Sequence, residues 1–205
     1  MKIWIHTPDW LIKLFPQVVW KFNTNKKIIF LTFDDGPTPG VTPRVLDFLC
    51  QAGMKATFFC LGENIQKYPD LAKRIVLEGH KIANHGFLHL NGLTVDSELY
   101  IDNMKRGAII SQSTLFRPPY GKIWPWQISK IKKLGNTVVL WNIMSMDFDC
   151  SIKPSEGLNN ITSHLSKGAI IVFHDTIKAS PNLITILPDF LAYLSENGFE
   201  SDVIH

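Results

Sequence analysis

Two adjacent carboxylates, Asp34 and Asp35, follow the apolar run 28–33 and precede the dipeptide Gly36-Pro37. Adjacent carboxylates at the end of a buried strand repel each other, and removing them from water is costly. A bound cation relieves both costs, so the motif indicates a cation site. The alternative is an ordinary polar turn, because Asp-Gly is a common turn dipeptide.

Two histidines, His85 and His89, are spaced i, i+4. On a helical turn this spacing places both imidazoles on one face, where each could reach one Zn²⁺ at ~2.0–2.1 Å. With an aspartate from another strand, the pair forms a two-histidine, one-carboxylate site that leaves positions open for water and substrate. The alternative is a histidine pair with no metal.

A third motif, Arg117-Pro118-Pro119-Tyr120, combines a permanent cation with a stiff backbone. The guanidinium could hold a catalytic carboxylate ionised and in place. The two prolines fix the turn, so that a backbone N–H after them can point rigidly into a cleft. An ordinary proline-rich loop with a surface arginine remains the alternative.

His174 ends another apolar run, and Asp147 lies after an earlier one. A carboxylate partner favours the imidazolium form and raises the pKa of a histidine, which suits a general acid. We therefore consider Asp147 a partner of His174. The alternative is a structural histidine that is held by a hydrogen bond.

The elements that must position these residues alternate between short β-rich runs and helical segments, at roughly 25–30 residues per unit. Strands are predicted at 28–33, 56–60, 81–83, 115–117, 138–141, 169–173 and 199–204. Helices are predicted at 42–53, 70–78, 97–110, 126–134, 159–166 and 183–196. Continuous apolar runs are typical of parallel strands buried on both faces. About seven βα units favour a small or incomplete (β/α) barrel with its chemistry at the carboxyl ends of the strands, and an open doubly wound sheet is the alternative.

The composition excludes several classes of protein. The 205 residues are 45% hydrophobic and 19% charged, which is enough apolar material for a sizeable core. A net charge of +3, with no dense basic block, gives no support for a nucleic-acid partner. Three cysteines exclude a disulfide scaffold. No apolar run approaches the ~18 residues of a transmembrane helix.

Residues 1–25 form an aromatic lead-in segment that contains Trp4, Trp10 and Trp20. It lacks a small-residue cleavage site and makes a poor signal peptide. We expect this segment to pack on the domain, and peripheral contact with a membrane surface is the alternative. Residues 26–205 are expected to form the catalytic domain.

Together, the motifs over residues 26–204 resemble the polysaccharide deacetylases of carbohydrate esterase family 4, the NodB homology domain. Residues 32–37, Thr-Phe-Asp-Asp-Gly-Pro, match the first family motif fully, and residues 85–89 match His-[Ser/Thr]-x-x-His except at Gly86. Residues 117–120 match Arg-x-Pro-Tyr. The fourth motif, Asp-x-x-Asp-Trp, is similar to residues 144–148, where Met144 and Phe148 are departures. Val172 replaces Leu in Leu-x-His.

This resemblance implies a distorted (β/α)7 barrel, similar to a TIM barrel, with the active site at its carboxyl rim. It implies that Asp35, His85 and His89 bind Zn²⁺ or another divalent transition metal such as Co²⁺. Gly86 lacks a hydroxyl that could brace this loop, so a more mobile metal loop is expected. Met144 removes a carboxylate that the chemical step does not need.

The resemblance also implies the catalytic roles. Asp34 is the general base and is steadied by Arg117, and His174 is the general acid and is tuned by Asp147. The backbone N–H of Tyr120 contributes to the oxyanion hole. The reaction is hydrolysis of an N-acetyl group on an amino sugar, which releases acetate.

Substrate binding is expected at Tyr120, Pro119 and Trp124. The aromatic rings of Tyr120 and Trp124 could stack on sugar rings, and packing in the core or at the rim is the alternative. The implied partner is a glycan such as peptidoglycan or a chitin-like oligosaccharide, and we expect a monomer. Two other functions remain open: deacylation of a small amide such as a lipid-linked sugar, and weakly active glycan binding on the same fold. Family members act in the cell envelope or outside the cell, although no clear signal peptide is visible here.

Overall fold

A single parallel sheet forms the centre of the computed structural model, which describes residues 4–205. Its strands follow the order β5-β4-β3-β2-β1-β7-β6, and β8 pairs with the start of β1. The strands are β1 (Ile28–Asp34), β2 (Ala56–Cys60), β3 (Lys81–Asn84), β4 (Leu115–Phe116), β5 (Thr137–Val138), β6 (Ile143–Met144), β7 (Ile170–His174) and β8 (Glu200–Ser201). Around the barrel, β1 to β5 follow one another, and β7 and β6 continue on the other side of β1, so that one gap remains between β5 and β6. The chain therefore forms a distorted (β/α)7 barrel, as predicted, and not a doubly wound sheet.

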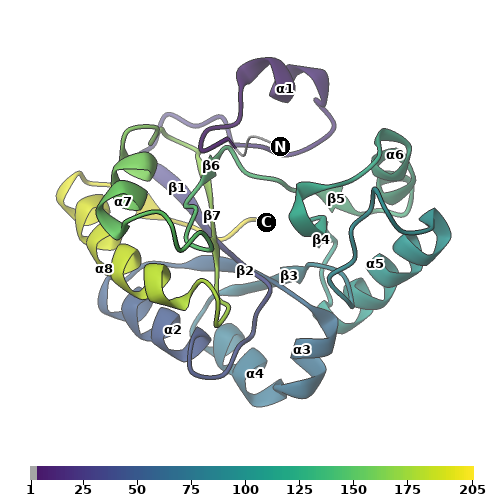
Figure 1. The fold of residues 1–205 in the computed structure, drawn as a ribbon, viewed down its shortest axis with the longest axis horizontal. Helices are drawn as coiled ribbons and strands as arrows, with labels where there is room; N and C mark the ends of the chain where they lie inside the picture. The colour runs from purple at the N-terminus through teal and green to yellow at the C-terminus, as the bar shows by residue number, and fades with distance from the viewer. Residues whose placement is uncertain (1–3) are drawn as a thin grey trace.

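Helices surround the sheet on its outside (Figure 1). They are α1 (Asp9–Leu14), α2 (Thr42–Gln51), α3 (Gly62–Lys67), α4 (Pro69–Leu77), α5 (Ser97–Ser111), α6 (Pro125–Lys133), α7 (Pro154–Thr162) and α8 (Ser180–Glu196), with a short 3₁₀ turn, η1 (Pro119–Gly121). The predicted helix at 159–166 was misplaced, because Pro154 starts α7 at a first-turn position. Within residues 4–205, we find no helix with the length and apolar character needed to cross a membrane.

The core lies on the outer face of the central strands, under α2 and α8. Phe33 of β1 stacks against Phe58 of β2 at 5.0 Å and against Phe173 of β7 at 5.7 Å between ring centroids. All three rings are fully buried. Because this aromatic layer ties β1 to both neighbours, it fixes the strand ends that carry the polar motifs.

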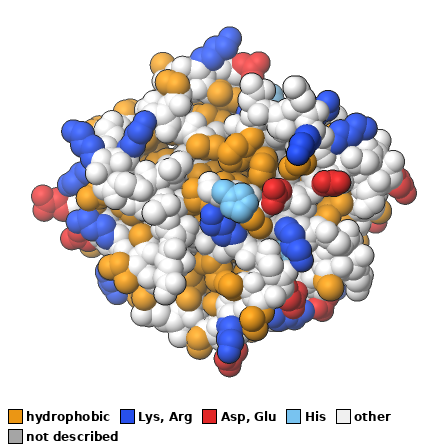
Figure 2. All heavy atoms as spheres, turned by 180° about the vertical axis from the view of Figure 1, so that it is seen from behind, with side chains coloured by type: hydrophobic (Ala, Val, Ile, Leu, Met, Phe, Trp, Pro, Cys, Tyr) orange, Lys and Arg blue, Asp and Glu red, His pale blue; other side chains and the backbone are white. Residues whose placement is uncertain are grey.

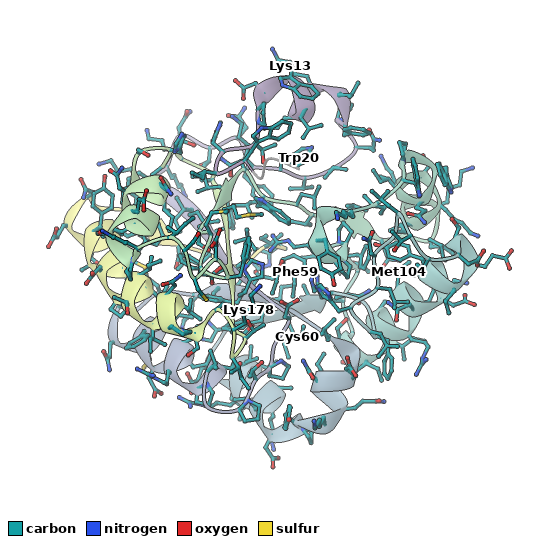
Figure 3. All side chains as sticks on the ribbon, viewed as in Figure 1. Lys13, Trp20, Phe59, Cys60, Met104 and Lys178 are labelled. Carbon is teal, nitrogen blue, oxygen red and sulfur yellow. The ribbon has the colours of Figure 1, made fainter. Side chains whose placement is uncertain are left out.

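The N-terminal segment fills the gap between β5 and β6. The Val19 N–H donates to the carbonyl of Val138 in β5 at 2.9 Å, and the carbonyl of Ile5 accepts from the N–H of Met144 in β6 at 2.8 Å. Figure 3 shows Trp20 beneath α1 facing the barrel, whereas Lys13 points outward from the same helix. The described part of the lead-in segment, residues 4–25, therefore packs on the domain, and residues 1–3 lie outside the described residues.

The C-terminal residues pack into the barrel interior. Ile204 is 1% exposed and belongs to a small apolar cluster that includes Phe59 and Val139.

Figure 2 shows the face turned away from the viewer in Figure 1, where lysines, arginines and acidic side chains spread around hydrophobic ones near a central histidine. Charges of both signs therefore share this face.

Helix α5 packs unusually close to the chain that follows β3. A Cβ atom at Gly107 would lie 2.2 Å from Oδ1 of Asn84 and 2.6 Å from the carbonyl carbon of Gly86. Only glycine permits this approach, so α5 directly supports the loop that carries His85.

We predict that Gly107→Ala lowers the free energy of unfolding. Overpacking at such contacts costs about 1–3 kcal/mol, which offsets the gain in helix propensity of about 1 kcal/mol. Ile109→Ala is the matched control, because Ile109 lies on the same helix and is 74% exposed. Urea denaturation should give a change within about 0.5 kcal/mol for the control. Equal stabilities of the two variants would contradict this packing.

Candidate functional site

Three side chains gather beyond the ends of β1 and β3. Oδ1 of Asp35 lies 3.1 Å from Nε2 of His89 and 3.4 Å from Nε2 of His85. One ligand atom from each residue lies within 4.8 Å of the others. Oδ1 of Asp35 is buried, and no donor in the described chain is aligned to hydrogen-bond it.

The electrostatics and donor types of this cluster fit a divalent metal. Burial alone raises the pKa of the Asp35 carboxyl, but the two neighbouring imidazoles outweigh burial and hold that pKa below its usual range. Two imidazoles and one carboxylate are a ligand set that suits divalent transition metals and leaves positions open. A buried carboxylate oxygen without a donor is the atom that such an ion would satisfy.

Backbone contacts orient two of these ligands. The carbonyl of Arg117 lies 2.8 Å from Nδ1 of His85. A carbonyl can only accept, so Nδ1 carries the proton and the lone pair of Nε2 faces Asp35. Asp35 itself has a φ of +80°, and its carbonyl accepts a hydrogen bond from Nδ2 of Asn64. This left-handed backbone turns the Asp35 side chain out of the strand direction.

The segment from His85 to His89 is a loop and not a helical turn, which corrects the sequence prediction. Gly86 has a φ of +89°, and a Cβ there would lie 2.7 Å from Nδ2 of Asn103. This backbone breaks helical geometry and favours glycine at position 86 of this chain. The two imidazoles still lie together, with centroids 5.2 Å apart.

Asn103 of α5 holds this loop, and the sequence did not reveal it. Its Oδ1 accepts from the N–H of Leu88, its Nδ2 donates to the carbonyl of Leu88, and its own carbonyl accepts from the N–H of Phe87. Asn84 adds a hydrogen bond to the N–H of Gly86. The side-chain amides of Asn103 and Asn84 therefore hold this loop, in which Gly86 lacks the Ser or Thr hydroxyl of the family motif.

A buried ion pair lies beneath the cluster. Nη1 of Arg117 contacts Oδ1 of Asp34 at 2.7 Å, and the Arg117 side chain is 0% exposed. The same guanidinium donates to the hydroxyl of Thr32 and to the carbonyls of Val139 and Leu140. Burial lowers the pKa of Arg117, and the charge of Asp34 partly opposes this effect. The carboxylate of Asp34 is thereby fixed in position.

A second pair joins β7 to the chain after β6. Oδ1 of Asp147 lies 2.8 Å from Nδ1 of His174, and Oδ2 accepts from the His174 backbone N–H at 2.7 Å. Burial lowers the pKa of His174, but the Asp147 carboxylate outweighs it and raises that pKa to about 9. His174 is therefore an imidazolium at neutral pH, with Nε2 free to donate a proton.

Asp175 is a third buried carboxyl that the sequence analysis did not assign. It accepts from the N–H of Gly36 at 3.1 Å and from the hydroxyl of Thr42. Burial raises its pKa to about 8. A Cβ at Gly36 would collide with this carboxyl. Asp175 therefore anchors the turn directly after Asp35, and its place beside His174 was the only signal in the sequence.

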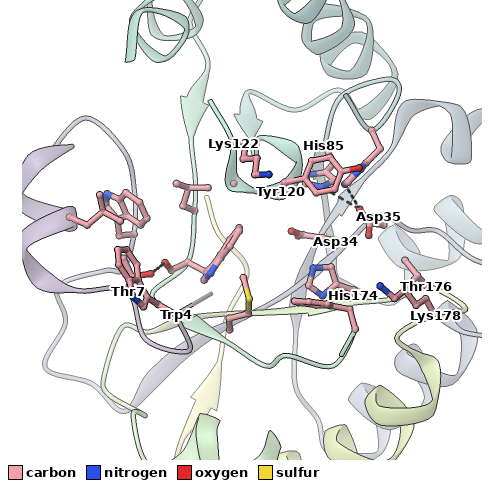
Figure 4. A pocket seen from close by; sticks show the side chains of 18 residues that line it. Trp4, Thr7, Asp34, Asp35, His85, Tyr120, Lys122, His174, Thr176 and Lys178 are labelled. Atoms are coloured by element: carbon pink, nitrogen blue, oxygen red, sulfur yellow. Dashed lines mark hydrogen bonds and ion pairs between the residues drawn. The ribbon is translucent and has the colours of Figure 1, made fainter. Parts of the chain in front are cut away.

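These groups open into one cavity of about 780 Å³. The predicted residues on its wall are Asp34, Asp35, His85, His89, Tyr120 and His174. Figure 4 shows Asp34 and His174 between the Asp35 cluster on one side and Trp4 and Thr7 on the other. Arg117 and Asp147 lie behind this wall, fully buried.

The three residues predicted to bind substrate differ in their exposure and in their position relative to the cavity. Tyr120 is 58% exposed and meets the ring of His89 edge-on at 4.3 Å between centroids. Pro119 is buried, and Trp124 is stacked on Trp126 at 4.7 Å. Of the three, only Tyr120 is among the described side chains that line the cavity.

Comparison with known proteins gives close relatives. Residues 21–139 match the family described as polysaccharide deacetylase. A peptidoglycan-N-acetylglucosamine deacetylase of Bacillus cereus is 33% identical over 188 residues, covering 89% of this chain and 88% of that protein. A chitooligosaccharide deacetylase of Azorhizobium caulinodans is 32% identical over 163 residues, covering 76% of this chain and 77% of that protein. The chain spans only 38% of a Listeria monocytogenes relative that is 35% identical.

Solved structures agree with these relatives. A peptidoglycan N-acetylglucosamine deacetylase in complex with 4-naphthalen-1-yl-N-oxidanyl-benzamide has a TM-score of 0.88 and 29% identity, covering 97% of this chain and 95% of that chain. A family 4 carbohydrate esterase from Streptomyces lividans in complex with acetate has a TM-score of 0.78 and 28% identity, covering 87% of this chain and 93% of that chain. The chain belongs to the polysaccharide deacetylase family, which confirms the resemblance seen in its sequence.

We predict that Asn103→Ala weakens Zn²⁺ binding by about 10–100-fold, as is usual when the support of a metal ligand is removed. Without the amide, the Leu88 N–H loses its partner and the Leu88 carbonyl keeps only the N–H of Leu90, so the loop holds His89 less firmly. Asp102→Ala is the matched control, because its side chain is 68% exposed on the same helix. Competition with a chromophoric chelator measures both affinities, and equal affinities would exclude this role of Asn103.

Proposed function

We propose that this protein is a metal-dependent hydrolase that removes N-acetyl groups from amino sugars of peptidoglycan or a chitin-like glycan. One observation carries the proposal: the Asp35 cluster, Asp34 and His174 line the same cavity. Amide hydrolysis needs an activated water, a base and an acid around one carbonyl, and these three elements supply them. The name of the Bacillus cereus relative supports N-acetylglucosamine of peptidoglycan as the unit attacked, and that of the Azorhizobium caulinodans relative supports a chitooligosaccharide.

The metal would be held by Asp35, His85 and His89. When bound, a divalent metal lowers the pKa of a coordinated water and polarises the acetyl carbonyl. Asp34 accepts the proton of the attacking water, and Arg117 holds the carboxylate of Asp34 in position. Fixing Asp34 in advance reduces the reorganisation that the transition state requires.

The amine must leave with a proton, because an amide anion is a very poor leaving group. His174 donates this proton to the amide nitrogen, and Asp147 stabilises the imidazolium beforehand. Tyr120 has a φ of +61°, and we assign its backbone N–H to the developing oxyanion. A donor in this role is worth about 2.7–4 kcal/mol.

We predict that Asp34→Asn lowers kcat by about 10²–10⁴-fold, because the amide cannot act as a base. Zinc content should remain close to that of the wild-type protein, since Asp34 is not in the ligand cluster. Asp35→Ala should lose both zinc and activity. Acetate release from N-acetylglucosamine oligomers and metal analysis separate these outcomes. Near wild-type turnover of Asp34→Asn at saturating zinc would refute the assigned base.

We predict an alkaline limit of activity near pH 9. The pKa of His174 is raised to about 9, so the protonated acid is present below that pH and is lost above it. In Asp147→Asn the raising charge is absent while burial remains, so the limit should move to lower pH. The pH profile of kcat and an NMR titration of His174 measure the shift. An unchanged profile would rule out His174 as the acid.

A further inference from the structure

The cavity has an apolar end that acetyl removal does not use. Its lining there consists of Leu11, Trp20, Leu140 and Trp141, which pack in one apolar cluster, and of Met144, which packs with Trp141. Trp20, Leu140 and Met144 are between 6% and 8% exposed, so these surfaces are largely shielded from water. We call these five residues the apolar chamber. Such a chamber beside a catalytic centre favours an apolar ligand group.

The N-terminal segment supplies two walls of the apolar chamber. Leu11 and Trp20 come from this segment, which is held in the gap by hydrogen bonds to Val138 and Asn142. Thr7 lies beside them, and its hydroxyl donates to the carbonyl of Trp141. The indole N–H of Trp20 donates to the carbonyl of Phe15. The Thr7 hydroxyl and the Trp20 indole N–H are already engaged, so neither is free to bind the hydroxyls of a sugar ring.

The opposite end of the cavity is polar and exposed. Tyr120, Thr176 and Lys178 lie there, on the same side as Asp35 (Figure 4). A trans amide sends its nitrogen substituent and its acyl substituent in opposite directions. With the sugar at the polar end, the acyl group is the substituent that points past Asp34 and His174 toward the chamber.

We propose that the apolar chamber binds acyl groups longer than acetyl, so that the enzyme releases carboxylates such as butyrate or hexanoate from N-acylated amino sugars. This proposal rests on the proposed amide hydrolysis. The C–N bond breaks, the water oxygen bonds to the carbonyl carbon, and an amide plus water becomes a carboxylate plus a protonated amine. The chemistry is that of acetyl removal, and only the acyl group differs.

The test uses glucosamine trisaccharides carrying N-acetyl, N-propionyl, N-butyryl or N-hexanoyl groups, with the zinc-loaded protein. Each buried methylene should raise kcat/KM by up to about fourfold. Calorimetric affinities of acetate, butyrate and hexanoate give a readout without turnover, and they should rise in the same order.

Two variants locate the effect. Leu11→Trp fills the chamber and should flatten the ratio of hexanoyl to acetyl kcat/KM. Leu14→Trp adds the same ring on the exposed side of α1, where Leu14 is 61% exposed, and should leave the ratio unchanged. If Leu11→Trp does not fold, Leu140→Phe adds a smaller volume to the chamber wall. Equal ratios in the filled variant and in Leu14→Trp would overturn the assignment of the chamber.

The failures are distinguishable. Release of acetyl with equal or slower release of every longer group would overturn this inference and leave the proposed function standing. Release of no acyl group at all would overturn both.

Discussion

The buried guanidinium of Arg117 is the group on which the arrangement of the site depends. Removing an arginine from water costs several kcal/mol unless its donors are satisfied. The hydroxyl of Thr32, the carboxylate of Asp34 and the carbonyls of Val139 and Leu140 satisfy them here. These partners come from β1 and from the chain after β5, so the arginine is stable only when strands on both sides of the barrel are in register. The contacts that orient the Asp34 carboxylate therefore form only when the barrel itself has formed.

The same requirement gives the N-terminal segment a structural role. The carbonyls that receive Arg117 belong to the stretch that continues β5, which pairs with β4 on one side and faces the gap in the sheet on the other. Val19 supplies the missing pairing, because its carbonyl accepts from the N–H of Leu140 at 2.8 Å. The lead-in segment thus fills the gap in the sheet through isolated β-bridges to both sides. It also brings Trp20 to the cavity wall, so closure of the barrel and the shape of the cavity are coupled.

The sequence predicted which residues meet at the site better than it predicted the backbone conformation around them. Continuous apolar runs located β1, β2 and β7 to within a residue, and the polar residues at their ends necessarily meet at one rim. The i, i+4 spacing of His85 and His89 gave the right neighbours but the wrong backbone, since spacing alone does not exclude a loop. Asn103 and β6 were missed because one amide in a helix and a two-residue strand leave no periodic signal.

Three buried carboxyl groups near the site differ in the partners that surround them. Asp34 is paired with a full cation and Asp147 with an imidazolium, whereas Asp175 has only the hydroxyl of Thr42 and the N–H of Gly36. Two charges are therefore compensated, and the third group avoids ionisation, as its raised pKa reflects. A neutral carboxyl can sit behind the turn that carries Asp35 without adding a third negative charge. The turn after Asp35 is thus anchored by a group that adds no charge beside the candidate metal ligands.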